Sequence, residues 1–249
     1  MHCFDWTYAQ IKEELPNIAA AGFSAVQTSP AHPREPVGAA WYMLYQPYDY
    51  KVGENGLGTK EGLTELCTEA HQYGVKIIVD VVANHTNGSL SYVASFWQDK
   101  SLYHDYQGGI DYSNRWQVTH GRLGMWDLKT EDSRVQEKIK EYVAELKSCD
   151  VDGIRWDAAK HIGLPSEGDT FWQNVPDQTM YNYGEILDGT GGNDTVSEKV
   201  EVVSQTTGVQ LHPVAGESSA KAMIYNLQGQ RVDANYHGVV VCNGRKYVQ

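Results

Sequence analysis

The sequence predicts an α/β fold, a partial (β/α)8 TIM barrel of about five β/α units followed by a small all-β tail. Three observations predict it. Segments with helical apolar spacing alternate with short strands, the strands are apolar on both faces, and polar residues gather where the strands end. Strands of this kind occur in parallel sheets that helices cover. A barrel of this type places its chemistry at the strand ends.

The first repeat of helix and strand covers residues 8–30. Ile11 and Leu15 are four residues apart, so they share one face of a predicted helix. Gly22 ends this helix, and residues 24–28 form a short strand.

The second repeat, residues 59–85, follows the same plan. Leu63 and Leu66 lie on the apolar face of the predicted helix, and Gly74 ends it. Residues 75–82, VKIIVDVV, then form a continuous apolar strand.

The third repeat covers residues 133–157. Val135 and Ile139 share the apolar helical face, and residues 151–156 form the strand. One more strand is predicted near 181–187. An open doubly wound sheet begins with the same alternation, but no G-x-G-x-x-G follows a strand, which disfavours its dinucleotide-binding version.

Composition restricts the classes of partner. The 249 residues carry a formal net charge of −12 and no basic patch, which argues against a nucleic-acid partner. No apolar run approaches the roughly 18 residues of a membrane span. The first residues lack the basic start and apolar stretch of a secretory signal.

The alternation of predicted helices and strands stops at residue 188, where the amino-acid composition changes. We expect residues 1–192 to form the barrel, 193–220 a linker, and 221–249 the β-rich tail. Short β-type runs in the tail are separated by Q-G-Q and N-G turns.

Two carboxylates at predicted strand ends indicate glycoside chemistry. Asp157 and Glu185 are about one β/α unit apart, so they should face one pocket. Two carboxylates about 5 Å apart suit a retaining glycosidase. We expect Arg155 to keep Asp157 ionised, and the apolar residues after Glu185 to raise the pKa of that acid. A structural Arg–Asp pair with a surface glutamate is the alternative.

Three segments carry a resemblance to a known family. DVVANH at 80–85, GIRWDAAKH at 153–161 and GEIL at 184–187 resemble three of the four signature regions of the α-amylase family, glycoside hydrolase family 13, in the same order. The resemblance covers about residues 1–192. It implies retaining hydrolysis of α-1,4-glucosidic bonds in starch-type α-glucans, although pullulanases and transglycosylases share these motifs.

The resemblance also implies roles for single residues. Asp157 resembles the catalytic nucleophile, Glu185 the general acid/base, and Arg155 the arginine that orients the nucleophile. The residues that correspond to substrate-binding positions are Tyr45, Trp41, His85, Lys160 and His161. Aromatic rings suit this task because they bury the apolar face of a pyranose; core packing is the alternative for such rings.

Calcium is the metal that the resemblance implies. Asn84 and Asp127 match the side-chain ligands, His161 matches a carbonyl ligand, and a carbonyl near Thr119 is a third candidate. Oxygen donors on distant loops suit Ca²⁺. A turn for Asn84 and a helix start for Asp127 are the alternatives.

The fourth signature region, which carries the third catalytic aspartate of the family, is not found after Glu185. We therefore expect a barrel without its last units and impaired hydrolysis. A non-catalytic glucan-binding protein and an inactive fragment are the alternatives.

The tail, residues 221–249, resembles a sorting domain of the type IX secretion system. This resemblance implies contact with the secretion machinery and a secreted or cell-surface location. A piece of the all-β domain that follows the barrel in amylases is the alternative.

Overall fold

A computed structural model describes residues 1–34, 40–106 and 108–186, together with four short strand segments between residues 224 and 248. The chain divides into two compact units, Met1–Gln205 and Thr206–Gln249. Each unit is described by itself.

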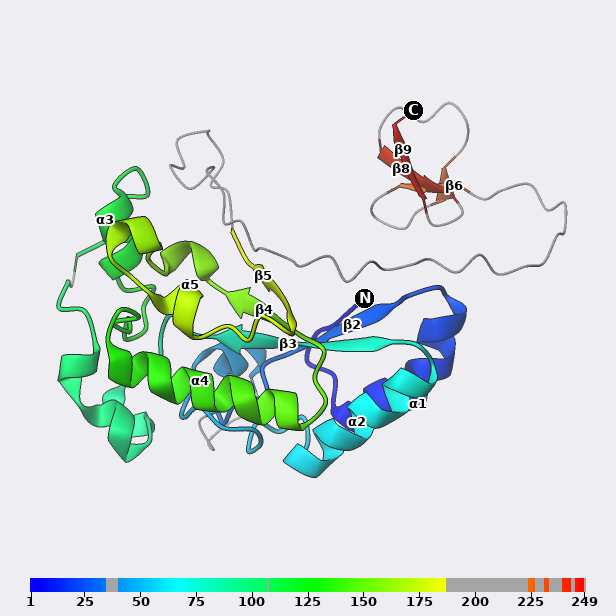
Figure 1. The fold of residues 1–249 in the computed structure, drawn as a ribbon, viewed down its shortest axis with the longest axis horizontal. Helices are drawn as coiled ribbons and strands as arrows, with labels where there is room; N and C mark the ends of the chain where they lie inside the picture. The colour runs from blue at the N-terminus through cyan, green and yellow to red at the C-terminus, as the bar shows by residue number, and fades with distance from the viewer. Residues whose placement is uncertain are drawn as a thin grey trace, which may run out of the picture. The chain divides into compact units, whose positions relative to one another are not determined.

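A five-stranded parallel sheet is the centre of the first unit (Figure 1). Its order follows the chain, and its strands are β1 (His2–Cys3), β2 (Ala25–Thr28), β3 (Lys76–Val82), β4 (Gly153–Asp157) and β5 (Tyr181–Gly184). The strand order of a doubly wound sheet reverses at a switch point. Because no reversal occurs among these strands, the predicted barrel-type arrangement is confirmed and the open doubly wound alternative is excluded.

The sheet is curled rather than flat. The Tyr183 hydroxyl on β5 donates a hydrogen bond of 2.6 Å to Oε1 of Gln27 on β2, across the two strands that lie between them. Side chains of non-adjacent strands meet in this way only on the concave face of a curved sheet. The five strands therefore form an arc of a barrel wall.

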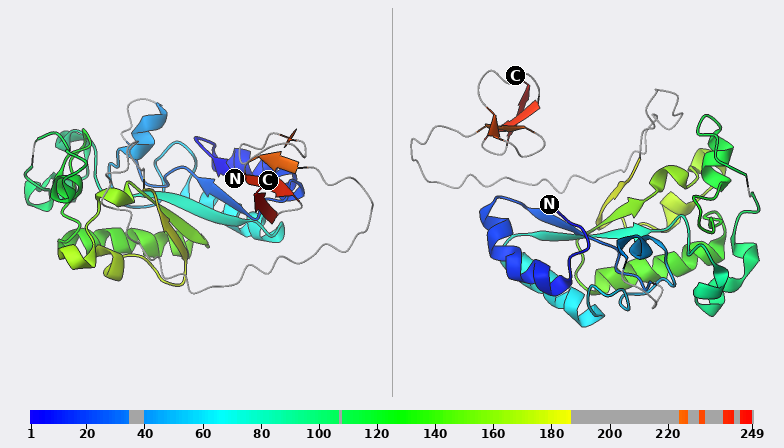
Figure 2. Two further views of the ribbon diagram at one scale, coloured as in Figure 1. Left: turned by 90° about the horizontal axis from the view of Figure 1, so that it is seen from above. Right: turned by 180° about the vertical axis from the view of Figure 1, so that it is seen from behind.

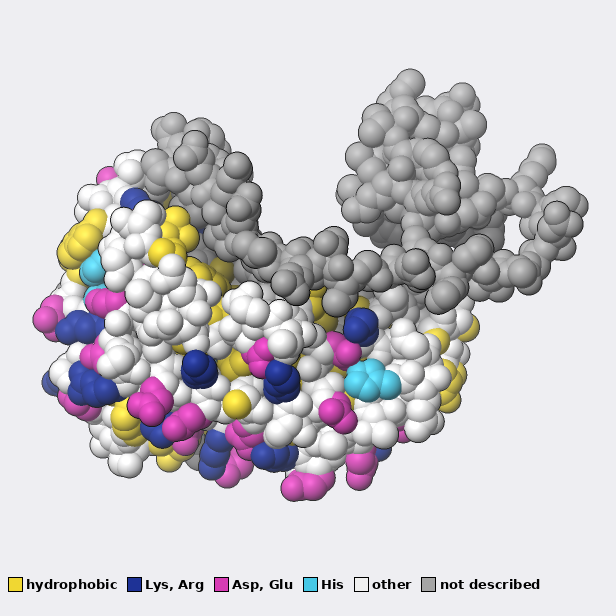
Figure 3. Space-filling model, in the orientation of Figure 1, with side chains coloured by type: hydrophobic (Ala, Val, Ile, Leu, Met, Phe, Trp, Pro, Cys, Tyr) yellow, Lys and Arg dark blue, Asp and Glu magenta, His cyan; other side chains and the backbone are white. Residues whose placement is uncertain are grey.

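Helices cover the convex face of the arc (Figure 2). They follow the strands in turn and are α1 (Tyr8–Ala20), α2 (Lys60–Gln72), α4 (Ser133–Ser148) and the single turn α5 (Phe171–Asn174). Outward-facing strand residues such as Val79, Ile154 and Trp156 are buried against Leu66 and Leu146 of these helices in one core. On the face of the molecule in view in Figure 3, acidic and basic side chains are interspersed.

Local signals explain the helix ends. Thr7 caps α1: its hydroxyl accepts from the Gln10 backbone N–H at 3.2 Å, and the Gln10 side chain accepts from the Thr7 N–H at 2.8 Å. Gly22 and Gly74 follow α1 and α2 with φ of 84° and 69°, a conformation that favours glycine. The helices predicted from apolar spacing are confirmed. Strand β1 was not predicted, because two residues carry no periodicity.

The long connection between β3 and α4 holds most of the irregular structure. It contains α3 (Arg115–His120) and three short 3-10 turns, η2 (Leu90–Tyr92), η3 (Ser95–Gln98) and η4 (Lys100–Leu102). Isolated bridges from His85 to Asp127 and from Tyr103 to Leu128 fix this connection beside the end of β3.

The second unit contains an antiparallel sheet of order β7-β6-β8-β9. Its strands are β6 (Ile224–Asn226), β7 (Arg231–Val232), β8 (Val239–Cys242) and β9 (Arg245–Val248). The predicted linker, residues 193–220, lies outside the described residues. Among the helices that the structure describes, none is both long and apolar enough to cross a membrane.

Candidate active site

One guanidinium group, that of Arg155, contacts three carboxylates. Its Nη1 lies 2.8 and 2.7 Å from the two oxygens of Asp80 and 2.8 Å from Oδ1 of Asp157. Its Nη2 lies 2.5 Å from Oε1 of Glu185. The two carboxylates that the sequence assigns to catalysis are therefore held on the same arginine.

The strand register explains this meeting. Arg155 and Asp157 are two residues apart on β4, so both side chains point to the concave face of the sheet. Asp80 on β3 pairs with Arg155 in the register of the parallel ladder. Glu185 directly follows β5, and its backbone N–H donates to the Trp156 carbonyl at 2.9 Å. Three neighbouring strands thus bring one guanidinium and three carboxyl groups to the same edge of the sheet.

The turn after β4 adds a backbone donor. Ala158 has φ 49° and ψ 31°, a left-handed conformation that is uncommon outside glycine. In this conformation its N–H donates to Oε2 of Glu185 at 3.2 Å. A side chain at Gly184 would meet Cβ of Ala159 at 2.7 Å, so a glycine is needed where β5 passes this turn. Backbone strain like that of Ala158 is characteristic of functional sites.

Burial and mutual repulsion raise the pKa of two of these carboxyls, Asp157 and Asp80. Desolvation and the charge of Asp80 raise the pKa of Asp157 to about 7, although Arg155 lowers it. Desolvation likewise raises the pKa of Asp80 to about 6 against the opposing effect of Arg155. Arg155 favours the ionised form of Asp157 as expected, but burial and the charge of Asp80 oppose it, because one arginine is shared among three carboxylates.

Glu185 lies in different surroundings from those expected. Its side chain contacts Arg155 and the Ala158 N–H rather than an apolar pocket, and Ile186 beside it is partly exposed. Leu187 lies outside the described residues.

A cavity of 440 Å³ opens beside these carboxylates. Its lining combines aromatic, apolar and charged side chains: Tyr45, His85, Tyr112, Leu123, Met125, Asp157, Ala158, Lys160, His161 and Glu185. Ligand sites commonly have this size and this mixture of apolar walls with a few polar groups. The sequence assigned Tyr45, His85, Lys160 and His161 to substrate binding, and the structure brings all four to this cavity.

Hydrogen bonds fix two residues of the cavity wall, Tyr45 and His85. Nε2 of His85 lies 3.0 Å from the Tyr45 carbonyl, which can only accept, so this nitrogen carries a proton. The Tyr45 hydroxyl donates to Oδ2 of Asp80 at 3.0 Å. Burial lowers the pKa of His85 to about 4, so the ring is neutral near pH 7. Tyr45 and His85 are therefore rigid, uncharged parts of the wall.

Of the remaining assigned residues, Lys160 and His161 line the cavity and Trp41 does not. Lys160 and His161 are buried, and Nζ of Lys160 lies 4.9 Å above the ring of Tyr112. Nδ1 of His161 lies 2.7 Å from the Val118 carbonyl, which accepts its proton. Trp41 is 53% exposed, packs edge-on to Tyr45, and does not line the cavity.

Four cavity residues were not predicted: Tyr112, Leu123, Met125 and Ala158. The first three lie in the β3–α4 connection, whose sequence has no helix or strand period. The contact between the Lys160 ammonium and the ring of Tyr112 joins residues far apart in the sequence, so no local sequence pattern indicates it.

Two of the residues expected to bind calcium, Asn84 and Asp127, are in contact. Nδ2 of Asn84 donates to Oδ1 of Asp127 at 3.1 Å, and both residues are buried. Nδ1 of His161 contacts the carbonyl of Val118, the residue before Thr119. Oδ1 of Asn84 is buried without a hydrogen-bond partner among the described residues. An unpartnered amide oxygen beside a buried carboxylate fits a hard cation such as Ca²⁺.

Comparison with known proteins decides the family. A model of the alpha-amylase catalytic domain matches residues 7–239. The chain belongs to the alpha-amylase family. An alpha-amylase of Clostridium acetobutylicum is 39% identical over 220 residues, which cover 80% of this chain and 29% of that relative.

Solved structures agree with the alpha-amylase fold. Alpha-amylase I of Eisenia fetida, in complex with maltohexaose, has a TM-score of 0.67 over 78% of this chain and 46% of its own. At 23% identity this likeness concerns the fold alone. The alpha-amylase of Geobacillus thermoleovorans, complexed with acarbose, has a TM-score of 0.62 and 27% identity, and the match covers 73% of this chain and 41% of that enzyme. The chain thus spans less than half the length of these amylases.

Proposed function

We propose that this chain is an α-amylase-like glycosidase that hydrolyses α-1,4-glucosidic bonds of starch-type glucans with retention of configuration. The observation that carries the proposal is the single guanidinium of Arg155 that holds both Asp157 and Glu185 at the edge of a 440 Å³ cavity. Membership of the alpha-amylase family supports it.

The reaction divides between the two carboxylates. Asp157 attacks the anomeric carbon of the bound sugar as Glu185 protonates the departing glycosidic oxygen. Glu185 then takes a proton from water, which attacks the anomeric carbon and releases Asp157. Nη1 of Arg155 keeps the carboxylate of Asp157 oriented. The ring of Tyr45 forms an apolar wall for the sugar.

A reducing-sugar assay on soluble starch tests this function. We expect slow release of reducing ends by the chain as it stands, none with Asp157→Asn, and a rate at least about 100-fold lower with Glu185→Gln. Equal rates for all three proteins would refute the catalytic assignment.

A non-catalytic glucan-binding protein is the second candidate. The ion pair of 2.5 Å between Arg155 and Glu185 favours it, because a proton donor has to leave such a pair before it acts. The absence of the fourth signature region from the sequence after Glu185 favours it as well. Acarbose binding without turnover of starch would select this candidate.

We also propose that calcium binds between Asn84 and Asp127, with backbone oxygens near Thr119 and at His161. The unpartnered Oδ1 of Asn84 supports this site. When bound, the ion neutralises Asp127 and ties the β3–α4 connection to the wall of the cavity. Chelation by EGTA should lower the melting temperature, and Asn84→Ala should remove most of that dependence.

We propose that the tail, residues 221–249, directs export of the protein. Its resemblance to a type IX sorting domain supports export to the cell surface or the medium. Fusion of residues 221–249 to a reporter in a host with this secretion system tests it: export of the fusion is expected, and retention would contradict the proposal.

A further inference from the structure

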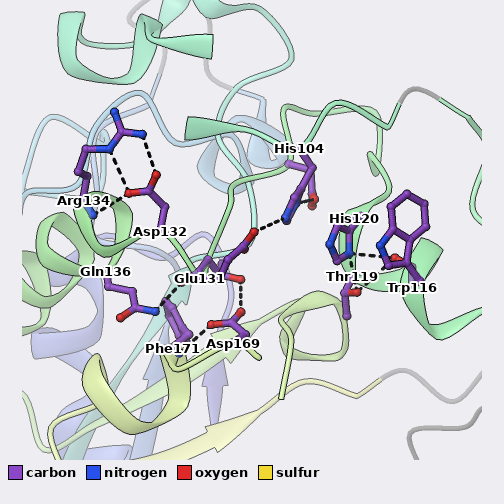
Figure 4. Close-up of polar contacts among 12 residues, drawn as sticks. His104, Trp116, Thr119, His120, Glu131, Asp132, Arg134, Gln136, Asp169 and Phe171 are labelled. Carbon is purple, nitrogen blue, oxygen red and sulfur yellow. Dashed lines mark hydrogen bonds and ion pairs between the residues drawn. The ribbon is translucent and has the colours of Figure 1, made fainter. Parts of the chain in front are cut away.

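Two histidines and a glutamate meet in the β3–α4 connection (Figure 4). His104 follows η4, His120 is the last residue of α3, and Glu131 precedes α4. One nitrogen of each ring and one oxygen of the carboxylate all lie within 4.8 Å of one another. Figure 4 shows the rings of His104 and His120 side by side.

Hydrogen bonds prepare both rings to bind through Nε2. Nδ1 of His104 lies 2.7 Å from Oδ2 of the buried Asp127. Nδ1 of His120 lies 2.9 Å from the Thr119 hydroxyl, which itself donates to backbone carbonyls, and 3.1 Å from the Trp116 carbonyl, which can only accept a proton. A histidine that donates its second ring nitrogen to a carboxylate or a carbonyl is the usual arrangement around a protein-bound metal.

The donor set distinguishes this cluster from the calcium site. Calcium prefers oxygen donors, whereas imidazole nitrogens suit zinc and other transition metals. Two histidines and one glutamate are a known zinc set with a fourth position for water. His104 is buried, while His120 and Glu131 face solvent in part, so both can move the short distance that coordination needs.

Aromatic packing positions the ring of His120. Trp116 stacks on His120 with ring centroids 4.7 Å apart and an interplanar angle of 22°. The rings of His104 and His120 are 4.2 Å apart. Both contacts keep the two imidazoles next to each other before any ion arrives.

We propose that His104, His120 and Glu131 bind a divalent transition-metal ion of the zinc type. The ion links the end of η4, the end of α3 and the start of α4. Through His104 it also fixes the orientation of Asp127. Its role is to hold the long connection that forms one wall of the cavity.

Titration calorimetry with zinc tests the site in the whole chain, with excess calcium present to saturate the oxygen site. Cobalt(II), added in place of zinc, should give the intense visible absorption of a tetrahedral nitrogen–oxygen site. His120→Gln keeps the size of the side chain and removes a strong ligand nitrogen. We expect it to weaken zinc binding by at least about tenfold. His71→Gln, at an exposed histidine that also pairs with an aspartate, is the control and should leave binding unchanged.

The competing explanation is an ion pair without metal. In it, His104 is a cation shared between Asp127 and Glu131, and His120 has no part. Zinc affinity that is undetectable, or equal in the parent chain and in His120→Gln, would overturn the proposal. A second variant, Glu131→Gln, should weaken zinc binding as His120→Gln does; unchanged affinity there would count equally against it. Circular dichroism of each variant separates loss of metal from loss of fold.

Discussion

Asp157 has an unfavourable charge in the folded chain. Desolvation and the neighbouring charge of Asp80 raise its pKa to about 7, above the value of about 3.9 for an unfolded aspartate. Between these two values the folded state binds more protons than the unfolded state. The contribution of Asp157 to stability is therefore fully present below about pH 4 and is lost as the pH rises through about 7.

We predict that Asp157→Asn stabilises the fold above pH 7. The gain is at most about 4 kcal/mol, less the cost of the lost contact with Arg155. The gain should shrink as the pH falls toward 4. Thermal melts of both proteins from pH 4 to pH 8 measure it. Asp150→Asn, at an exposed position after α4, is the matched control and should change stability by less than about 0.5 kcal/mol. A gain that does not depend on pH would contradict the electrostatic cause.

Tyr45 offers a second test, on ligand affinity. Tyr45→Ala removes the ring from the cavity wall and should weaken acarbose binding by about tenfold. Tyr45→Phe keeps the ring and removes only the hydroxyl bond to Asp80, so its affinity should stay within about threefold of the parent. Calorimetry distinguishes the two. Equal losses in both variants would mean that the hydroxyl, and not the apolar face, contacts the ligand.

Strand pairing between β4 and β5 places Glu185. A side chain at Gly153 would meet the Tyr181 carbonyl of β5 at 2.7 Å, a distance that backbone atoms cannot accommodate without a shift. We predict that Gly153→Ala costs about 1–3 kcal/mol and loosens β5. Faster amide exchange in residues 181–184 and a lower rate of starch cleavage should accompany the loss.

Gly62→Ala is the matched control for this change. Gly62 lies in α2, and a side chain there would make only ordinary contacts at 3.6 Å or more. Because alanine is the better helix former, this change should be neutral or stabilise by up to about 1 kcal/mol. Destabilisation by both variants would show that added bulk, and not the pairing of β4 with β5, is responsible.

Some helices and strands can be predicted from the sequence and others cannot. The apolar runs of β3 and β4 and the glycines after α1 and α2 have strong local signals, so these elements were predicted close to their observed bounds. Strand β1 is too short for a periodic signal. The β3–α4 connection is ordered by tertiary contacts such as the bridge from His85 to Asp127, which no local pattern indicates.

For the candidate site, too, the sequence predicts one part and not the other. Asp157 and Glu185 were assigned from motifs at strand ends, and the parallel register brings such ends to one edge of the sheet. The electrostatics could not be derived from the sequence. They depend on how many carboxylates share Arg155, which is a property of three strands together.

An arc of five strands has two edges. Among the described strands, β1 and β5 each have only one hydrogen-bonded neighbour, whereas a closed barrel has no edge. The arc nevertheless delivers both carboxylates and Arg155 from β4 and β5 alone. We therefore propose that this part of the alpha-amylase barrel already contains a working nucleophile and its proton donor.

Covalent labelling tests that claim most directly. With α-maltosyl fluoride the leaving group needs no proton donor, so a Glu185→Gln variant should still form the sugar–enzyme bond but release it slowly. Mass spectrometry of the digested variant should then find a maltosyl group on Asp157. It should find none when Asp157→Asn is added to the same variant. A peptide around Asp157 that stays unmodified, or labelling that persists in the double variant, would contradict the assignment of Asp157 as the nucleophile.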